Sequence, residues 1–523
     1  MQIQMATFWI ATSLSLLAMT SGAAMAAINI PFTINLSENV AVTGTPRIAV
    51  DVGGNTRYAT YTSGTGTNAL TFTLSPTVGD VDLDGVTLSS PIDLNGGTMK
   101  DSAGNDAALT FTPPNTSGIK VNYPSLGMDF TNGTTGRYTL NGTVYNDLSS
   151  FLTASSGSYT RASIGTYYDS TGTLQTASNN TPRFDYDPVT HAAKGILIEE
   201  SKLNLILQSQ KLGTTWSINN SGTTTITDNA TTSPDSTTNA STISASVNAG
   251  GVYQVRTVTS GTTYTQSVYL KFISGSSTSI RIGNDISGFT GYIAINPQTM
   301  AITFQAANVL SSSISNIGNG WYRAVVSWTS TGTSASFTIY NNMASPIVFA
   351  AWGAQLEQGN FTTSYIPTTT LAITRAADNL VVGNSSAWLG NDIGALTLKA
   401  RTFGARPAWG YAQLWDGTTT NRIAIINSGG VTGSVNTSGV NYATMGGPTP
   451  AGLLNAGISY AINNINLVYG GNTYTDTSAP IPVINQLKIG GSSTGTTELN
   501  GWMQAVKYYP LQPSNTQLGL MTQ

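Results

Sequence analysis

Three aspartates at alternate positions have the spacing of a cation site. Asp80, Asp82 and Asp84 are followed directly by Gly85, the order of ligands and glycine that opens the calcium loop of an EF-hand. Pro91 stands where that loop carries its glutamate, and no flanking helices are predicted, so an EF-hand is excluded. Calcium is the natural candidate for the bound cation. The alternative is an aspartate-rich turn whose carboxylates accept hydrogen bonds from backbone N–H groups without a metal.

Two adjacent glutamates, Glu199 and Glu200, raise the hypothesis of a glycoside hydrolase, which needs two carboxylates flanking one glycosidic bond. Neighbours in a strand point to opposite faces, so at most one of them could serve a shared sugar. The sequence favours an ion pair between one glutamate and an arginine such as Arg161 or Arg183. No signature selects a catalytic pair among the other notable carboxylates, which are Asp185, Asp187, Asp378 and Asp416.

The chain contains no cysteine and a single histidine, His191. A thiolate nucleophile, a thiolate metal site and a histidine-cluster zinc site are therefore excluded. His191 ends the segment Asp187-Pro188-Val189-Thr190-His191, which is typical of a turn, so a structural role is favoured over that of the base in a Ser-His-Asp triad. We expect no enzymatic activity and, calcium apart, no cofactor.

Aromatic side chains near turns are candidates for sugar binding, because an aromatic face packs against the C–H groups of a sugar ring. Ordinary core packing is the competing interpretation, and it is favoured for Trp328 and Trp352, which lie in apolar runs. The candidates on either side of the Arg406-Pro407-Ala408 and Asp416-Gly417 turns are Trp409, Tyr411 and Trp415, and those in the preceding module are Trp321, Tyr322, Trp352 and Tyr365.

The composition indicates what kind of protein positions these side chains. Only 9% of the 523 residues are charged, there are 55 glycines, and the net charge is −3. So long a chain is expected to form several modules. Its nearly neutral, hydroxyl-rich surface offers no basic footprint for a phosphate backbone, which excludes nucleic acid as a partner.

Apolar residues alternate with polar ones over most of the chain. Leu70, Phe72 and Leu74 alternate with threonines, and the same period of two recurs from Trp502 to Tyr508. This pattern predicts an all-β, multi-domain string of β-sandwiches. The clearest helix signal is a capping pattern that opens at Ser514, with Gln517 three residues later.

Residues 1–26 have the outline of an export signal. An apolar run from Phe8 to Met19 precedes Ala24-Met25-Ala26, which predicts cleavage before Ala27. No lysine or arginine precedes the run, so a hydrophobic assembly or anchoring segment is the alternative. No other stretch is long and apolar enough to span a membrane, and we expect an extracellular, cell-surface or virion location.

Two segments in the first half of the chain resemble known families. Residues 27–122 contain NLSENVAVTGTPRIAV, GTNALTFTL, GDVDLDGVTL and LNGGTMKDSAGNDAALTF in order, and they resemble a bacterial Ig-like domain of surface adhesins. Residues 123–210 carry Arg161-Ala-Ser163, Pro182-Arg-Phe-Asp185, Gly195 and Glu199-Glu200. This connecting segment is similar to a stretch of phage and prophage tail-fibre proteins.

The second half contains two further resemblances. Residues 211–376, with YTQSVYLKF, GNGWYRAVVSW and FAAWGAQLEQGNFTTSYIPTT, resemble a jelly-roll carbohydrate-binding module. Residues 377–523, with GALTLKARTF, WDGTTTNRIAI and LNGWMQAVKYYPLQPSNTQLGLMT, resemble a concanavalin A-like, laminin-G-type domain.

Together these resemblances imply a non-enzymatic surface or virion protein of the tail-fibre type. It would act in adhesion or receptor recognition, bind cell-surface polysaccharides or other glycans, and form a homo-oligomer, in tail fibres a trimer. The alternatives are a polysaccharide depolymerase of a tail spike and a purely structural fibre or decoration protein.

Overall fold

A computed structural model of the chain describes residues 5–9, 29–286, 289–383, 385–390, 392–403, 408–448, 452–491 and 497–523. Side chains are described from residue 29 onward within these ranges, except at 286, 408 and 409. Of the predicted export segment only Met5–Trp9 is described, as strand β1, which pairs with β2 (Ile30–Thr43). The predicted cleavage site lies outside the described residues.

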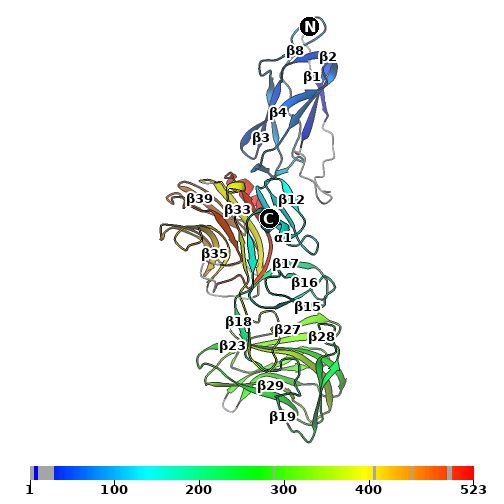
Figure 1. The fold of residues 1–523 in the computed structure, drawn as a ribbon. Helices are drawn as coiled ribbons and strands as arrows, with labels where there is room; N and C mark the ends of the chain where they lie inside the picture. Colours follow the sequence, from blue (N-terminus) through cyan, green and yellow to red (C-terminus); the bar gives the residue numbers. More distant parts are fainter. Residues whose placement is uncertain are drawn as a thin grey trace.

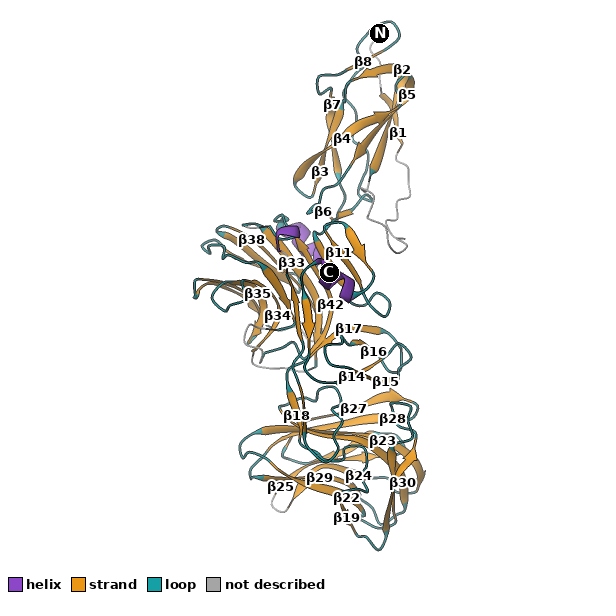
Figure 2. Cartoon of the chain, viewed as in Figure 1, coloured by secondary structure: helices purple, strands orange, loops and turns teal. Residues whose placement is uncertain are grey.

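The protein is all-β, as the alternation predicts, and its strands are arranged in three bodies along one axis (Figures 1 and 2). The first body is the N-terminal module, residues 29–122, in which Leu70, Phe72 and Leu74 are fully buried. Its main sheet has the strand order β1-β2-β5-β4-β3-β7, with β8 beside β2. Its strands after β2 are β3 (Arg47–Val52), β4 (Asn55–Ser63), β5 (Thr67–Leu74), β6 (Val81–Asp82), β7 (Thr87–Asp93), β8 (Thr98–Lys100) and β9 (Val121–Asn122).

The second body, the central sandwich, takes its strands from two separate parts of the chain. Its first sheet has the order β12-β11-β10-β42-β33-β38-β39-β40, with β16 and β17 attached through β42. Residues 123–210, expected as a connecting segment, thus share one sheet with residues of the last predicted domain. The strands are β10 (Leu126–Asp129), β11 (Arg137–Leu140), β12 (Thr143–Tyr145), β16 (Phe184–Tyr186), β17 (Ala193–Ile198), β33 (Gly394–Thr402), β38 (Leu453–Ala461), β39 (Asn464–Tyr469), β40 (Asn472–Asp476) and β42 (Gly501–Tyr509).

The second sheet of the central sandwich has the order β13-β32-β41-β34-β35-β36-β37. One hydrophobic core lies between the two sheets, with Leu396, Leu414 and Val506 at its centre. The strands of this sheet are β13 (Ser158–Thr160), β32 (Asn379–Val382), β34 (Ala408–Trp415), β35 (Arg422–Ser428), β36 (Val431–Thr437), β37 (Val440–Gly447) and β41 (Gln486–Ile489), and a separate hairpin consists of β14 (Gly165–Tyr168) and β15 (Leu174–Ala177).

The third body, the inserted sandwich, interrupts the central one between β18 (Lys202–Asn204) and β31 (Ile373–Arg375), which pair with each other. Its sheets have the orders β19-β22-β29-β24-β25-β26 and β20-β21-β30-β23-β28-β27. The strands are β19 (Ser217–Asn219), β20 (Thr224–Thr231), β21 (Ala240–Ala245), β22 (Gly251–Thr257), β23 (Thr263–Gly275), β24 (Ile280–Ile286), β25 (Phe289–Asn296), β26 (Ala301–Gln305), β27 (Val309–Gly318), β28 (Trp321–Thr329), β29 (Ser334–Asn341) and β30 (Ile347–Gln358).

Helices are short and few in the described ranges: α1 (Leu148–Ala154), α2 (Asn515–Met521) and the 3₁₀ turn η1 (Ser385–Ala387). The Ser514 hydroxyl accepts a hydrogen bond from the backbone N–H of Gln517 at the start of α2, so the predicted N-cap is confirmed. The Gln517 side chain does not complete a capping box, because it contacts Leu83 and Asp84 of the N-terminal module instead. Among the described residues no helix has the length and apolar character needed to cross a membrane.

Candidate functional site

A cleft of about 860 Å³ lies where the inserted sandwich faces the central one. The central sandwich contributes residues of β17, β33 and β42 and of the β14–β16 region. The inserted sandwich contributes the outward face of β27 and β28 and the loop 360–365. The aromatic side chains that border the cleft are Tyr167, Tyr168, Tyr269, Phe361, Tyr365, Phe403 and Trp502, and the charged ones are Asp185, Asp187, Lys194, Arg323 and Arg401. Tyr269 and Tyr365 are at most 2% exposed and belong to the interior behind the cleft surface.

Trp502 occupies the centre of the wall formed by the central sandwich. In the antiparallel sheet it lies opposite Arg401 of β33 on one side and Leu197 of β17 on the other. Cross-strand partners project from the same face of a sheet, so these three side chains form one row that faces the cleft. Phe403 packs edge-on against Trp502, with ring centroids 4.8 Å apart.

Asp185 fixes the indole of Trp502 in place. One carboxylate oxygen of Asp185 accepts a 2.8 Å hydrogen bond from Trp502 Nε1, and the other accepts a 2.6 Å bond from the backbone N–H of Tyr168. Burial raises the pKa of Asp185, and these donors together with Lys194 oppose that rise. Asp185 therefore positions the aromatic wall from beneath.

Asp187 and Lys194 line the cleft at its partly exposed edge. Burial acts to raise the pKa of Asp187, but hydrogen bonds from the backbone N–H groups of Thr190 and Val189, with the charge of Lys194, lower it to about 2. Lys194 Nζ lies 3.5 Å from Asp187 Oδ2 and 5.1 Å from the centre of the Trp502 ring. His191 follows in a turn with φ of 59°, so the predicted turn is confirmed.

The opposite wall is rich in hydroxyl groups. Strand β27 contributes Ser311, Ser313 and Ser315. Arg323 of β28 donates hydrogen bonds to Ser267 Oγ (3.0 Å) and Thr362 Oγ1 (2.9 Å). A surface that combines hydroxyls with aromatic faces suits a ligand that has both polar edges and apolar faces.

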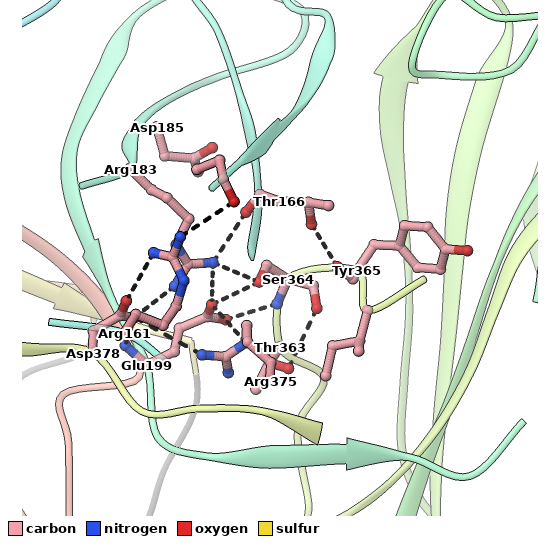
Figure 3. A network of polar contacts seen from close by, with 12 residues as sticks. Arg161, Thr166, Arg183, Asp185, Glu199, Thr363, Ser364, Tyr365, Arg375 and Asp378 are labelled. Atoms are coloured by element: carbon pink, nitrogen blue, oxygen red, sulfur yellow. Dashed lines mark hydrogen bonds and ion pairs between the residues drawn. The ribbon is translucent and has the colours of Figure 1, made fainter. Parts of the chain in front are cut away.

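A buried ion network lies beside the cleft (Figure 3). Arg183 contacts Glu199 at 2.7 Å and Asp378 at 2.6 Å, and Arg161 Nη1 lies 3.3 Å from Asp378. Arg375 Nε lies 3.5 Å from Glu199. All five side chains are at most 1% exposed. The predicted ion pair between a glutamate and Arg161 or Arg183 is confirmed for Glu199 and Arg183.

This network joins the two sandwiches through Ser364. The backbone N–H and the hydroxyl of Ser364 each donate a 2.7 Å hydrogen bond to Glu199. Burial acts to raise the pKa of Glu199, but Arg375, Arg183 and these donors lower it to about 2. Glu200 pairs separately with Lys202 at 2.9 Å. The two glutamates therefore have different partners and do not converge on one ligand.

Of the sequence-nominated aromatic side chains that the structure describes, Tyr365 borders this cleft but is only 2% exposed, and the others lie elsewhere. Trp321 and Tyr411 are each 2% exposed and Trp415 is 8% exposed, so these three belong to the protein interior and not to a stacking surface. Tyr322 is half-buried and packs against the core of the inserted sandwich. Trp409 lies in β34, and its side chain is outside the described part of the structure. Trp328 and Trp352 are buried in the core, as predicted.

Of the predicted calcium ligands, Asp82 and Asp84 interact with each other, and all three have further partners. Asp80 forms an ion pair with Arg57 at 2.6 Å, and Asp82 accepts hydrogen bonds from the backbone N–H groups of Gly53 and Gly85, both at 2.7 Å. Asp84 accepts a hydrogen bond from the amide of Gln517 in α2. No group of three or more acidic or histidine side chains within the described ranges could hold a metal. An arginine and N–H donors therefore contact these carboxylates, as the turn interpretation predicts.

In the sequence, Trp502 and Gln504 stand out only as members of an alternating strand, and no pattern selects Phe403, Tyr167 or Tyr168. Alternation does indicate that Trp502 and Gln504 share a face. No local pattern indicates that another module stands opposite that face.

No family model matches the chain, and no curated protein matches it. Among solved structures, it is similar to domains LG4-5 of the mouse laminin alpha1 chain, with 11% identity and a TM-score of 0.18 over 50% of this chain and 86% of that one. This likeness is too slight to bear on function.

Proposed function

We propose that the protein is a non-enzymatic glycan-binding surface protein and that its glycan site is the cleft between the central and inserted sandwiches. The proposal is supported by one observation above all: an aromatic wall centred on Trp502 faces a wall of serine hydroxyls across a cleft large enough for several sugar units. Sugars offer C–H faces to aromatic rings and hydroxyl edges to serines, so the two walls match the two kinds of sugar surface.

Binding to a glycan array tests this proposal. We expect Trp502→Ala to lower the binding at least tenfold, because the substitution removes the central stacking surface; a tenfold loss corresponds to about 1.4 kcal/mol. Tyr442→Ala is the matched control, since Tyr442 is an exposed aromatic side chain of β37 that does not line the cleft. Equal binding by the wild-type and Trp502→Ala proteins would place the site elsewhere.

A second candidate function is polysaccharide depolymerisation, and one observation favours it. Asp185 and Asp187 both line the cleft, and their pKa values are shifted in opposite directions, the pattern of an acid and a base in glycoside hydrolases. Hydrogen bonds from N–H donors already occupy both carboxylates, so we rank binding first. Reducing-sugar release that disappears in Asp187→Asn would favour the enzyme; glycan binding without any release would exclude it.

We further propose an extracellular, cell-surface or virion setting of the tail-fibre type, with several copies in one assembly. A single glycan site binds weakly, and copies held together raise the effective concentration. Sedimentation of the purified full chain tests the assembly: a trimer is the expected state, and a monomer at all concentrations contradicts it.

A further inference from the structure

The charged side chains that line the cleft differ in how many hydrogen-bonding or ion-pair partners they already have within the protein. Asp185 is buried, and both of its oxygens accept hydrogen bonds from N–H groups. Arg323 donates to two hydroxyls and lies 5.2 Å from the ring centre of Tyr269. Neither group is available to a ligand without giving up these contacts.

Arg401 and Lys194 are different, because both lie beside Trp502 and neither is held by a close hydrogen bond. Arg401 is exposed and makes no hydrogen bond or ion pair within the part of the chain that the structure describes. Lys194 shares a single carboxylate, that of Asp187, at 3.5 Å, and this oxygen-to-nitrogen distance is longer than a close charged hydrogen bond.

The balance of charge in the cleft is therefore positive. Three cations, Lys194, Arg323 and Arg401, face two carboxylates, those of Asp185 and Asp187. The whole chain, by contrast, carries a net charge of −3. A cationic cleft in an anionic protein favours an anionic ligand over a neutral one.

The geometry points to an acidic saccharide, one that carries carboxylate or sulfate groups, as the ligand of this cleft. This inference rests on the proposed function. A sugar ring packed on the Trp502 wall would place an acidic substituent beside Arg401, the cross-strand neighbour of Trp502. A guanidinium group binds a planar carboxylate or a sulfate through two parallel hydrogen bonds, and Lys194 supplies a second positive charge on the same wall.

A glycan array with matched pairs tests the inference. Each pair presents one oligosaccharide with free and with methyl-esterified carboxyl groups, or with and without its sulfate groups. We expect the full-length protein to bind the acidic member at least tenfold more tightly. Arg401→Gln is expected to remove most of that preference, because it weakens the binding of the acidic member far more than that of the neutral one, whereas Trp502→Ala weakens the binding of both.

Arg47→Gln is the matched control, because it removes the same charge from the N-terminal module, where Arg47 pairs with Asp93 on the surface. Equal binding of both members of each pair, unaffected by Arg401→Gln but weakened by Trp502→Ala, would overturn the acidic ligand and leave the glycan site standing. A preference for the free carboxyl or the sulfated member identifies which acidic group is bound. Binding to no glycan at all would overturn both proposals.

Discussion

Ser364 donates two 2.7 Å hydrogen bonds to the two carboxylate oxygens of Glu199, although the two residues lie 165 positions apart. Glu199 belongs to the central sandwich, where it also contacts Arg183 and Arg375. Ser364 belongs to the loop of the inserted sandwich that lines the cleft. This buried carboxylate therefore helps to fix the relative position of the two cleft walls, together with the hydrogen bonds from Arg183 to Ser364 and from Thr166 to the backbone oxygen of Tyr365.

Glu199→Gln is expected to destabilise the fold by about 3–5 kcal/mol, because it leaves buried arginines with too little negative charge. Calorimetry or urea unfolding of the full chain measures the loss. Glu38→Gln removes an exposed carboxylate of the N-terminal module and is expected to change the stability by less than about 0.5 kcal/mol. Equal unfolding midpoints for the Glu199→Gln variant and the wild-type protein would contradict a supporting role for the network.

The buried carboxyl group of Glu498 is expected to make the folded protein less stable as the pH rises. Burial raises its pKa from 4.5 to about 7, so between these values the folded state holds a proton that the unfolded state has released. Stability then falls as the pH rises from about 4.5 to 7. Glu498→Gln removes this loss, so we expect the variant to be more stable than the wild-type protein at pH 8 by up to about 3 kcal/mol and to show no gain at pH 4. A gain that is the same at both pH values would show that the ionisation of Glu498 is not its cause.

Trp321→Ala is expected to act on stability and not directly on glycan binding. The side chain is 2% exposed, and its Nε1 donates a hydrogen bond to the backbone oxygen of Thr232. Truncating such a residue costs about 3–5 kcal/mol. Tyr322→Ala, at the neighbouring half-buried position, is expected to cost less. Calorimetry compares the two variants, and an unchanged melting temperature for Trp321→Ala together with lost glycan binding would restore Trp321 as a stacking residue.

Calcium is expected to leave the melting of the protein unchanged. Asp80 already pairs with Arg57, and Asp82 is held by two backbone N–H groups, so the carboxylates have partners without a metal. Calorimetry with excess calcium and with EDTA measures the difference. A calcium-dependent rise in melting temperature that disappears in Asp84→Asn would show that the turn is a metal site.

The strands could be predicted from local alternation because each buries a single face. Leu70, Phe72 and Leu74 are fully buried, as their period of two requires. The cap of α2 could be predicted because Ser514 and Gln517 interact within one turn. Both signals are local in the chain.

The partnership between distant strands could not be predicted in this way. Met128 of β10 lies opposite Val506 of β42, and the inserted sandwich separates the two in the chain. Alternation indicates which face of a strand is buried, but it does not indicate which other strand pairs with it. The predicted domain boundaries near residues 210 and 376 therefore separated two segments that together form one sandwich.

The assignment of aromatic residues failed for a related reason. Trp321 projects from the outward face of its sheet, and Leu174 of β15 covers that face, so the ring is buried in a small second core. Trp502 also projects outward, but it borders a cleft. The local alternation pattern does not depend on whether another module packs against the outward face of a strand. Only the placement of the modules therefore distinguishes a buried structural aromatic residue from one that could bind a ligand.

The paired strands at the neck would allow the inserted sandwich to be replaced as one unit, a cassette. Asn204 lies opposite Ile373 in the β18–β31 pair, so the two ends of the cassette leave the central sandwich side by side. Replacing everything between them alters no strand pairing in the body that carries Trp502. Since the serine wall belongs to the cassette, such a replacement would change the ligand while the aromatic wall is inherited intact.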